Sequence, residues 1–121
     1  PETLEDLRQH ACILDTNRRA PRRWVFRPNG VEEVVEVQGR FQVNSASAAV
    51  QLAAEGLGVC YGPRFALRAA LDAGRLVPVL QRTPGETVPV SAIYLEGRAL
   101  PRKIRALIDF AAEDIRLNGN L

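Results

Sequence analysis

The sequence predicts an α/β fold with a largely parallel sheet flanked by helices, and two observations carry this prediction. Short apolar segments typical of buried strands alternate along the chain with helical patterns. Helices also follow strands after only one or two residues, as they do in βαβ units. The chain has 121 residues and is 46% hydrophobic, which suits one domain with a buried core.

The first part of the chain is rich in strand signals. The predicted elements are a short helix at 2–9 with Thr3 as N-cap, strands at 11–14 ("ACIL") and 23–27 ("RWVFR"), and a turn at 28–30 ("PNG"). In the stretch "VEEVVEVQGRFQVN" (31–44), apolar and polar side chains alternate with a period of two over 35–38 and 40–43. This alternation predicts a strand pair or one bent strand, with Gly39 at the bend or bulge.

The clearest helix covers residues 45–57 of the stretch "NSASAAVQLAAEGLGVCYGP". Its apolar residues fall on one helical face: Ala46, Ala49, Val50, Ala53, Ala54 and Leu57. Ser45 is the predicted N-cap, and Gly56 and Gly58 supply the left-handed end of the helix. A short buried strand, 59–62, follows at once.

The start of this helix is also a candidate binding site. Asn44, Ser45 and Ser47 place an amide and two hydroxyls beside free backbone N–H groups, and capping accounts for only one of the three. In parallel sheets, ligands collect beyond the carboxyl ends of the strands, where helix N-termini point. The pattern therefore favours a site for a carboxylate or another small anion, with ordinary capping as the alternative.

The second half continues the alternation of helices and strands. The predicted elements are a helix from Pro63 to Gly74, a strand at 75–80 with Pro78 at an edge or bulge, a linker at 81–89, a strand at 90–95 and a helix at 101–115. The last helix begins with basic residues and carries acidic ones later, against the helix dipole. This indicates either a basic surface for an acidic partner segment or a solvated face with an Arg105–Asp109 pair.

Several classes of chemistry lack their signatures. The net charge of +2 comes from "RRAPRR"; without Arg18, Arg19, Arg22 and Arg23, twelve basic residues face fourteen acidic ones. We interpret this stretch as a solvated turn around Pro21, with a phosphate-contacting patch as the alternative. Cys12 and Cys60 lie far apart in apolar runs, as buried reduced thiols do.

No metal-ligand cluster, nucleotide-binding motif or nucleophile elbow occurs in the sequence, and His10 is the one histidine. A surface or helix C-terminal role suits His10 better than catalysis. We therefore expect no enzyme, no cofactor and no metal. No apolar run is long enough for a membrane helix, and the polar N-terminus does not resemble a signal peptide.

Five stretches of the chain, taken in order and with their spacing, match one known family: "PETLEDLRQHACI", "RRWVFRPNG", "VQGRFQVNSASAAVQLAAEGLGVCYGP", "LDAGRLVPVL" and "IYLEGRALPRKIRALIDFAAEDI". On these residues the chain resembles, nearly end to end, the second half of the effector-binding domain of LysR-type transcriptional regulators.

The resemblance implies a periplasmic-binding-protein-like (type 2) fold of two α/β lobes around a cleft. Residues 1–86 would form the second lobe, and 87–121 would be a strand and helix that cross back to the first lobe. The residues implied to face a small effector, for which a carboxylate is the candidate, are Asn44, Ser45, Ser47, Gly62, Pro63 and Thr16. The family further implies a bacterial, cytoplasmic homodimer or homotetramer that senses the effector and acts on DNA.

Two departures from the family pattern stand out. The winged helix-turn-helix and most of the first lobe are absent from this sequence, so we expect a fragment that contacts DNA only through a missing N-terminal domain. The loop after the first strand, "DTNRRAP", has no cysteine, which disfavours peroxide sensing. The alternatives are a solute-binding protein lobe of the same fold and a pure oligomerisation module that uses exposed apolar faces.

Overall fold

The computed structural model describes residues 1–94 and 100–118. The chain forms two compact units, Pro1–Glu86 and Thr87–Leu121. Each unit has its own secondary structure, and the predicted site residues all belong to the first.

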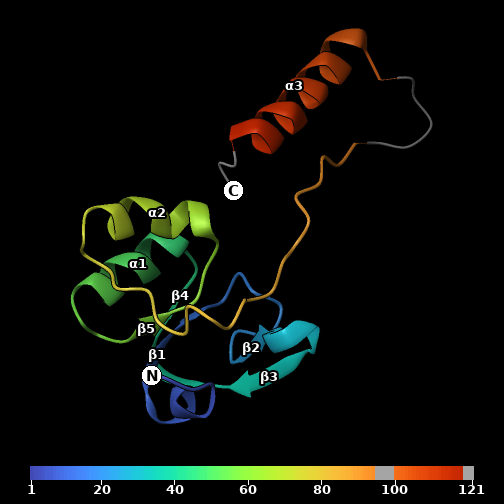
Figure 1. Cartoon of the computed structure of the whole chain (residues 1–121). Coiled ribbons are helices and arrows are strands. Elements are labelled where there is room, and N and C mark those ends of the chain that lie inside the picture. Colours follow the sequence, from blue (N-terminus) through green and yellow to red (C-terminus); the bar gives the residue numbers. More distant parts are fainter. Residues whose placement is uncertain (95–99, 119–121) are drawn as a thin grey trace. The chain divides into compact units, whose positions relative to one another are not determined.

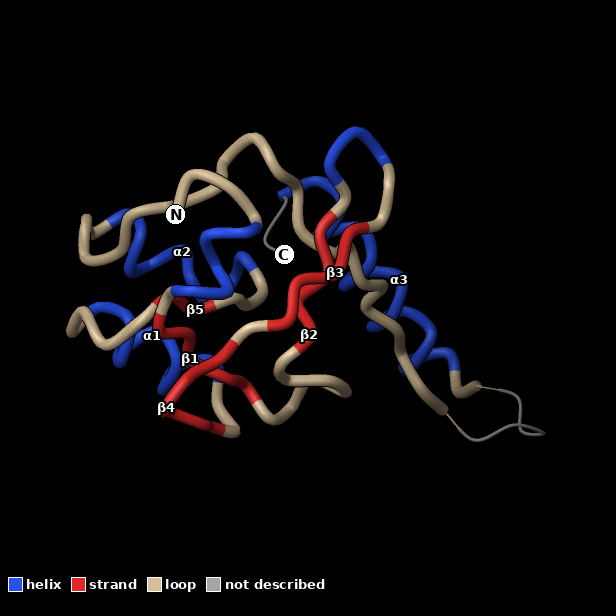
Figure 2. The backbone as a smooth tube through the Cα atoms, turned by 90° about the horizontal axis from the view of Figure 1, so that it is seen from below, coloured by secondary structure: helices blue, strands red, loops and turns tan. Residues whose placement is uncertain are grey.

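A three-stranded parallel sheet forms the centre of the first unit (Figures 1 and 2). Its order is β4 (Gln38–Val43), β1 (Ala11–Asp15), β5 (Val59–Cys60), so β1 is the middle strand. Helix α1 (Ala46–Ala54) packs on this sheet, and α2 (Arg64–Asp72) packs beside α1. The predicted α/β class with parallel strands is confirmed.

The other face of the sheet is covered by a hairpin and a short helix. Strands β2 (Arg23–Phe26) and β3 (Glu33–Glu36) pair antiparallel on either side of the 3₁₀ turn η2 (Pro28–Gly30), and the 3₁₀ helix η1 (Glu5–Gln9) contacts β3. The buried core between these layers consists of Leu7, Cys12, Leu14, Trp24, Phe26, Val35 and Val37. Burial of these side chains supplies most of the driving force for folding of the unit.

The alternating stretch 31–44 was predicted as a strand pair or one bent strand, and it contains two strands, β3 and β4. Its first half pairs with β2 and its second half with β1, so the two halves belong to different sheets and do not pair with each other. The predicted irregularity at Gly39 is confirmed, because the register between β1 and β4 shifts there. A methyl group at Gly39 would lie 1.6 Å from the carbonyl oxygen of Cys12. Only glycine allows the two strands to approach this closely.

Helix α1 begins at a serine cap, and both α-helices of the first unit end at a glycine. The Ser45 side chain accepts a hydrogen bond from the Ala48 N–H at 3.4 Å, which confirms the predicted N-cap of α1. At the other end, Gly56 has a φ of 74° and its N–H donates to Ala53, while the next N–H, of Leu57, donates to Leu52. This is a Schellman motif, and α2 repeats it around Gly74.

The first predicted helix is shorter and tighter than its pattern indicated. Residues 5–9 form a 3₁₀ helix rather than a helix from residue 2. The predicted role of Thr3 is nevertheless visible, since its hydroxyl accepts from the Asp6 N–H at 3.3 Å. In return the Asp6 carboxylate accepts from the Thr3 N–H at 2.9 Å. This is the reciprocal pattern of a capping box.

Two strands predicted after α2 are not formed in the described residues, whereas the linker predicted at 81–89 contains the boundary between the two units. Residues 75–80 form no strand, because they find no pairing partner and Pro78 lacks an N–H. The predicted linker is in part ordered against β2, since the Arg27 N–H donates to Pro84 and Gly85 bridges Phe26. Of the strand predicted at 90–95, residues 90–94 form none, and residue 95 lies outside the described residues.

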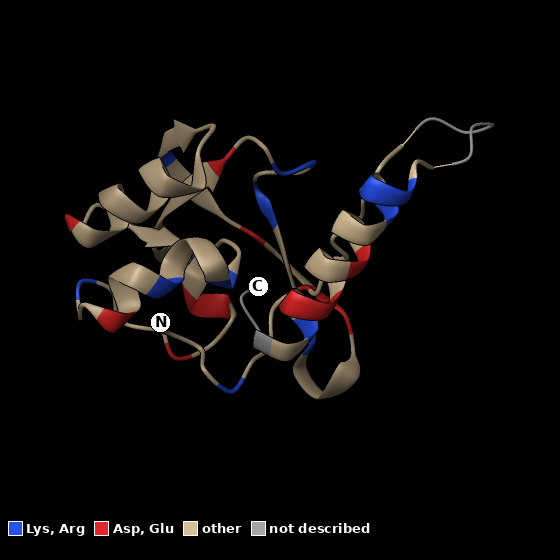
Figure 3. Ribbon diagram, turned by 90° about the horizontal axis from the view of Figure 1, so that it is seen from above, with Lys and Arg blue, Asp and Glu red and all other residues tan. Residues whose placement is uncertain are grey.

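The second unit contains one helix within its described residues, α3 (Arg102–Asn118), which confirms the predicted C-terminal helix. Figure 3 shows its basic residues near its start and acidic ones further along. No ion pair joins Arg105 and Asp109, so the predicted pair does not form within the described part of this helix. Leu107, Phe110 and Leu117 are exposed.

Candidate functional site

Three loops meet at the carboxyl edge of the parallel sheet. They consist of residues 15–17 at the end of β1, residues 44–47 from the end of β4 into the first turn of α1, and residues 61–63 after β5; we call this set the loop edge. All six predicted site residues lie in it. The cause is topological, because the carboxyl ends of parallel strands share one edge.

Hydrogen bonds join the first two loops. Both the backbone N–H and the hydroxyl of Thr16 donate to the carbonyl of Val43, at 2.7 and 3.1 Å. The Asn17 side-chain amide donates to the carbonyl of Asn44 at 2.6 Å. The loop after the central strand is thus tied to the end of β4 and to the residue that precedes the cap of α1.

The start of α1 presents unused hydrogen-bonding groups. The side chains of Asn44 and Ser47 are exposed, and Ser45 is half-buried by its capping role. Among the described residues, no acceptor is recorded for the N–H groups of Ala46 and Ser47. Unpaired N–H groups in a first turn, together with the positive end of the helix dipole, favour a bound anion.

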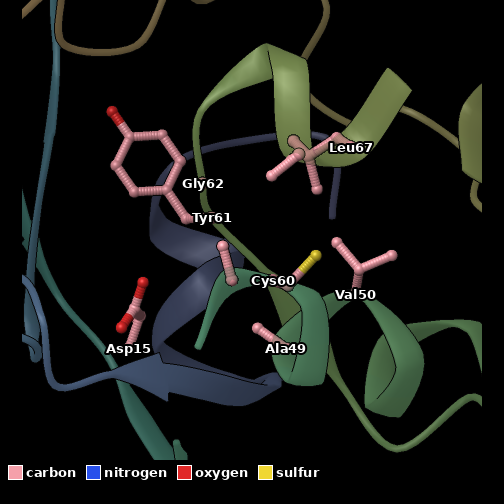
Figure 4. Close-up of a pocket in the computed structure, with 9 residues that line it drawn as sticks. Asp15, Ala49, Val50, Cys60, Tyr61, Gly62 and Leu67 are labelled. Carbon is pink, nitrogen blue, oxygen red and sulfur yellow. The ribbon is translucent and has the colours of Figure 1, made fainter. Parts of the chain in front are cut away.

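Gly62 and Pro63 close the edge on the β5 side. Pro63 is exposed, and Gly62 is half-buried with nothing within 4 Å of a methyl group placed on it. Gly62 also lines a small cavity of about 10 Å³ between the sheet end, α1 and α2 (Figure 4). A volume of this size holds about one water molecule.

The lining of this cavity is apolar with one exception. Ala49, Val50 and Leu67 face it, together with the Cys60 thiol, whereas Asp15 contributes a carboxylate. Asp15 is only 9% exposed and is the one buried charged residue within the described parts of the chain. Sequence reasoning missed it; the available signal was "DTN" directly after a buried strand, where an aspartate turns the chain through its own side chain.

A second group that the sequence did not reveal is an aromatic cluster around Tyr61, which we define as Arg18, Trp24, Phe26, Tyr61 and Glu86. The Tyr61 ring lies 5.2 Å from the rings of Trp24 and Phe26. The Arg18 guanidinium stacks over it at 4.6 Å and pairs with Glu86 at 2.9 Å. The prediction that Arg18 belongs to a solvated turn was therefore wrong, although Arg19, Arg22 and Arg23 are exposed.

The Tyr61 hydroxyl is fully used inside this cluster. It donates to the Val25 carbonyl at 2.7 Å and accepts from the Glu86 N–H at 2.8 Å. Burial is the largest cause that raises the pKa of Tyr61 above its ordinary value, and the hydrogen bond from Glu86 acts in the opposite direction. The hydroxyl is a structural clamp at neutral pH rather than a proton donor for chemistry.

Both cysteines are free; Cys12 is buried as predicted, whereas Cys60, also predicted to be buried, is half-buried. Burial raises the pKa of the Cys12 thiol to about 11 and also raises the pKa of Cys60. A thiol with a raised pKa holds little thiolate at neutral pH and reacts slowly.

The remaining polar clusters show no further site. His10 is exposed, and its Nδ1 lies 2.7 Å from the carbonyl oxygen of Asp6, in the helix C-terminal role that we expected. No group of three potential metal ligands occurs in the described residues. Within the same residues, no helix combines the length and apolar character needed to cross a bilayer.

Comparisons with known proteins agree with this architecture. The model of the LysR substrate-binding domain family matches residues 1–116. The chain is 30% identical over 118 residues to the probable HTH-type transcriptional regulator LtrA of Klebsiella pneumoniae, covering 95% of the chain and 38% of that relative. It is 28% identical over 109 residues to the HTH-type transcriptional activator AaeR of Escherichia coli, covering 90% and 35%. The chain thus spans little more than a third of these relatives.

Solved structures share the fold. The regulatory domain of AphB from Vibrio vulnificus, treated with cumene hydroperoxide, superposes with a TM-score of 0.65 at 26% identity, covering 93% of this chain and 56% of that one. Full-length AphB, a virulence activator of Vibrio cholerae described as a member of the LTTR protein family, gives a TM-score of 0.61 at 29% identity, covering 71% and 29%.

Proposed function

The chain belongs to the LysR substrate-binding domain family, and from this premise we propose that its loop edge forms one wall of a small-molecule effector site in a DNA-binding transcriptional regulator. One observation carries the proposal: the exposed Asn44 and Ser47 side chains stand beside unused N–H groups at the start of α1. Such a helix start stabilises a carboxylate or a similar anion.

The mechanism that we propose is a shift between conformations rather than catalysis. In it, the first unit is the second lobe of the regulatory domain, and the second unit contributes a segment to the other lobe. An effector that contacts both lobes stabilises their closed arrangement by its differential affinity, and this alters the assembly on DNA. The Thr16 and Asn17 hydrogen bonds support the proposal, because they make two of the loops respond as one.

The partners follow from the same premise. Relatives described as HTH-type regulators suggest that DNA is contacted by a helix-turn-helix part of the complete protein, outside the residues of this chain. We propose a cytoplasmic homodimer or homotetramer as the working assembly. The absence of catalytic constellations from the sequence supports a sensing role over turnover.

A pair of substitutions at the N-cap tests the site without loss of the cap. Asp and Asn both cap helices well, so Ser45→Asp and Ser45→Asn keep α1 intact, while only Asp adds a negative charge. The measurement is the rise in melting temperature of the complete regulator with a panel of short-chain organic acids. We expect Ser45→Asn to keep the rise and Ser45→Asp to weaken binding roughly tenfold or more by charge repulsion.

DNA affinity without ligand is the control, and it should be equal in both variants and the parent. If Ser45→Asp responds to the acids as the parent does, the effector does not bind at this helix start. The proposal would then be wrong even though the fold stands.

A further inference from the structure

Asp15 is the buried carboxylate closest to the proposed effector site. It is the last residue of β1, on the helix-covered side of the sheet, and it is only 9% exposed. In Figure 4 its carboxyl group points from the end of β1 toward the space beneath the Tyr61 ring, next to α1. Ala46, at the start of α1, and Gly62 line the same cavity.

The hydrogen bonds of this carboxylate are incomplete. One oxygen accepts from the Asn17 N–H at 2.9 Å. For the other oxygen, no donor is recorded among the described residues, and no ion pair recorded there involves Asp15. The side chains around it are largely apolar. The residue is largely buried, but this oxygen is not itself sealed from solvent, so a donor at the loop edge can reach it and would be stabilised by the carboxylate charge.

The cavity itself is too small for more than about one water molecule, so it is the floor of a site rather than the whole of it. One end of a ligand at the loop edge would rest on this floor. Two kinds of group then meet the ligand: N–H donors at the start of α1, and an acceptor at Asp15. A simple anion would satisfy the donors and be repelled by the acceptor.

From this arrangement we infer that Asp15 selects an effector that carries a hydrogen-bond donor, such as a hydroxyl or an ammonium group, beside its anionic group. The inference rests on the proposed function and names the ligand class for it. The carboxylate of such a ligand faces Ala46 and Ser47, and its donor binds the free oxygen of Asp15. Hydroxy acids and amino acids fit this description, and unsubstituted carboxylates do not.

Propionate, lactate and alanine test the inference, because they share one carbon skeleton and differ in the group on the second carbon. Their affinities for the complete regulator are measured by saturation-transfer difference NMR, which detects weak binding to large proteins. We expect lactate and alanine to bind roughly tenfold more tightly than propionate. In Asp15→Asn, the preference for alanine should disappear, because the amide carries no charge to attract the ammonium group.

Asp72→Asn is the matched control, since it makes the same change at an exposed residue of α2 and should leave all three affinities unchanged. Equal binding of the three acids to the parent would overturn the inference, while loss of that binding in Ser45→Asp would keep the proposed function. A preference for alanine that survives in Asp15→Asn would remove Asp15 from the role. Binding of none of the three to the parent would overturn both the inference and the proposed anion site. The comparison within the parent protein decides the question even if Asp15→Asn does not fold.

Discussion

The aromatic cluster and the loop edge share Tyr61 but differ in how most of their polar groups are satisfied. In the cluster, the Tyr61 hydroxyl has both of its hydrogen-bond partners within the same unit and Arg18 pairs with Glu86, although the Arg18 Nε is buried without a partner among the described residues. One residue further along the chain, Gly62 is open, and across the sheet the first turn of α1 has donors without recorded acceptors in the described chain. The first region builds a rigid platform, and the second keeps its hydrogen-bonding capacity for a ligand.

The substitution with the largest expected effect should disrupt the aromatic cluster and the loop edge together. Gly39→Ala places a methyl group 1.6 Å from the Cys12 carbonyl, where the backbone of β1 cannot yield. We expect a loss of about 4 kcal/mol or more in the free energy of unfolding, in the range that is diagnostic of backbone clashes. Urea denaturation followed by Trp24 fluorescence measures it.

Gly62→Ala is the control for that experiment, because a methyl group there meets nothing within 4 Å. Its free energy of unfolding should stay within about 0.5 kcal/mol of the parent value. Equal losses in the two variants would show that the β1–β4 contact does not need a glycine.

A pH titration probes the core that the aromatic cluster packs against. Cys12 has a pKa of about 11 in the folded chain against an ordinary value of 9.0, so the folded state disfavours its thiolate. Its contribution to stability is complete below pH 9 and is lost as the pH rises through 11. The loss amounts to about 2–3 kcal/mol.

The measurement is the difference in unfolding free energy between the parent and Cys12→Ala as a function of pH. This difference should shrink steadily from about pH 9 to 11. A difference that is flat over this window would mean that the thiol is not desolvated.

Tyr61→Phe tests the comparison by removing the hydroxyl, and with it two hydrogen bonds, from the aromatic cluster. The Val25 carbonyl loses its donor and the Glu86 N–H loses an acceptor, while the ring packing is kept. We expect a loss of about 1–2 kcal/mol at neutral pH. Amide hydrogen exchange at Glu86 should accelerate, and unchanged exchange would argue against the clamp.

The pH dependence of this variant has a definite sign. Since the folded state raises the pKa of Tyr61 above 10.0, the hydroxyl's contribution is complete below pH 10 and is lost as the pH rises beyond it. Tyr61→Phe should therefore lose less stability than the parent does above pH 10.

The smallest effects come from the loop edge. Ser45→Ala removes the N-cap of α1 and should cost about 1 kcal/mol. Ser47→Ala alters an exposed side chain two residues later and should cost less than about 0.5 kcal/mol. Thermal denaturation separates the two, and a larger cost for Ser47→Ala would show that its hydroxyl is engaged in the fold.

The sequence was most informative where structure depends on local chemistry. The Ser45 cap, the glycine stops of α1 and the bulge at Gly39 follow from properties of single residues, and all were predicted. Placement of the six candidate residues along one edge followed from parallel topology. Their use as an effector site stays a prediction.

Features that depend on distant partners were not predictable. Apolar segments at 75–80 and 90–94 look like strands, but a strand exists only where another pairs with it. The reverse holds for Gly85, which the composition assigns to a linker and which pairs with Phe26. Asp15 and Tyr61 belong to ordinary strand patterns. Only the fold reveals that Asp15 is buried with one oxygen unpaired, and that Tyr61 is held by two aromatic rings and two backbone hydrogen bonds.

The contact between Gly85 and Tyr61 has a consequence for how relatives of this chain can vary. A methyl group at position 85 would lie 2.7 Å from the Tyr61 hydroxyl oxygen, and the ring is held between Trp24 and Phe26 and cannot swing aside. A larger residue at position 85 therefore requires a smaller one at position 61. Positions 61 and 85 are distant in sequence. They should nevertheless covary among relatives whose chain follows the same path at the end of the first unit.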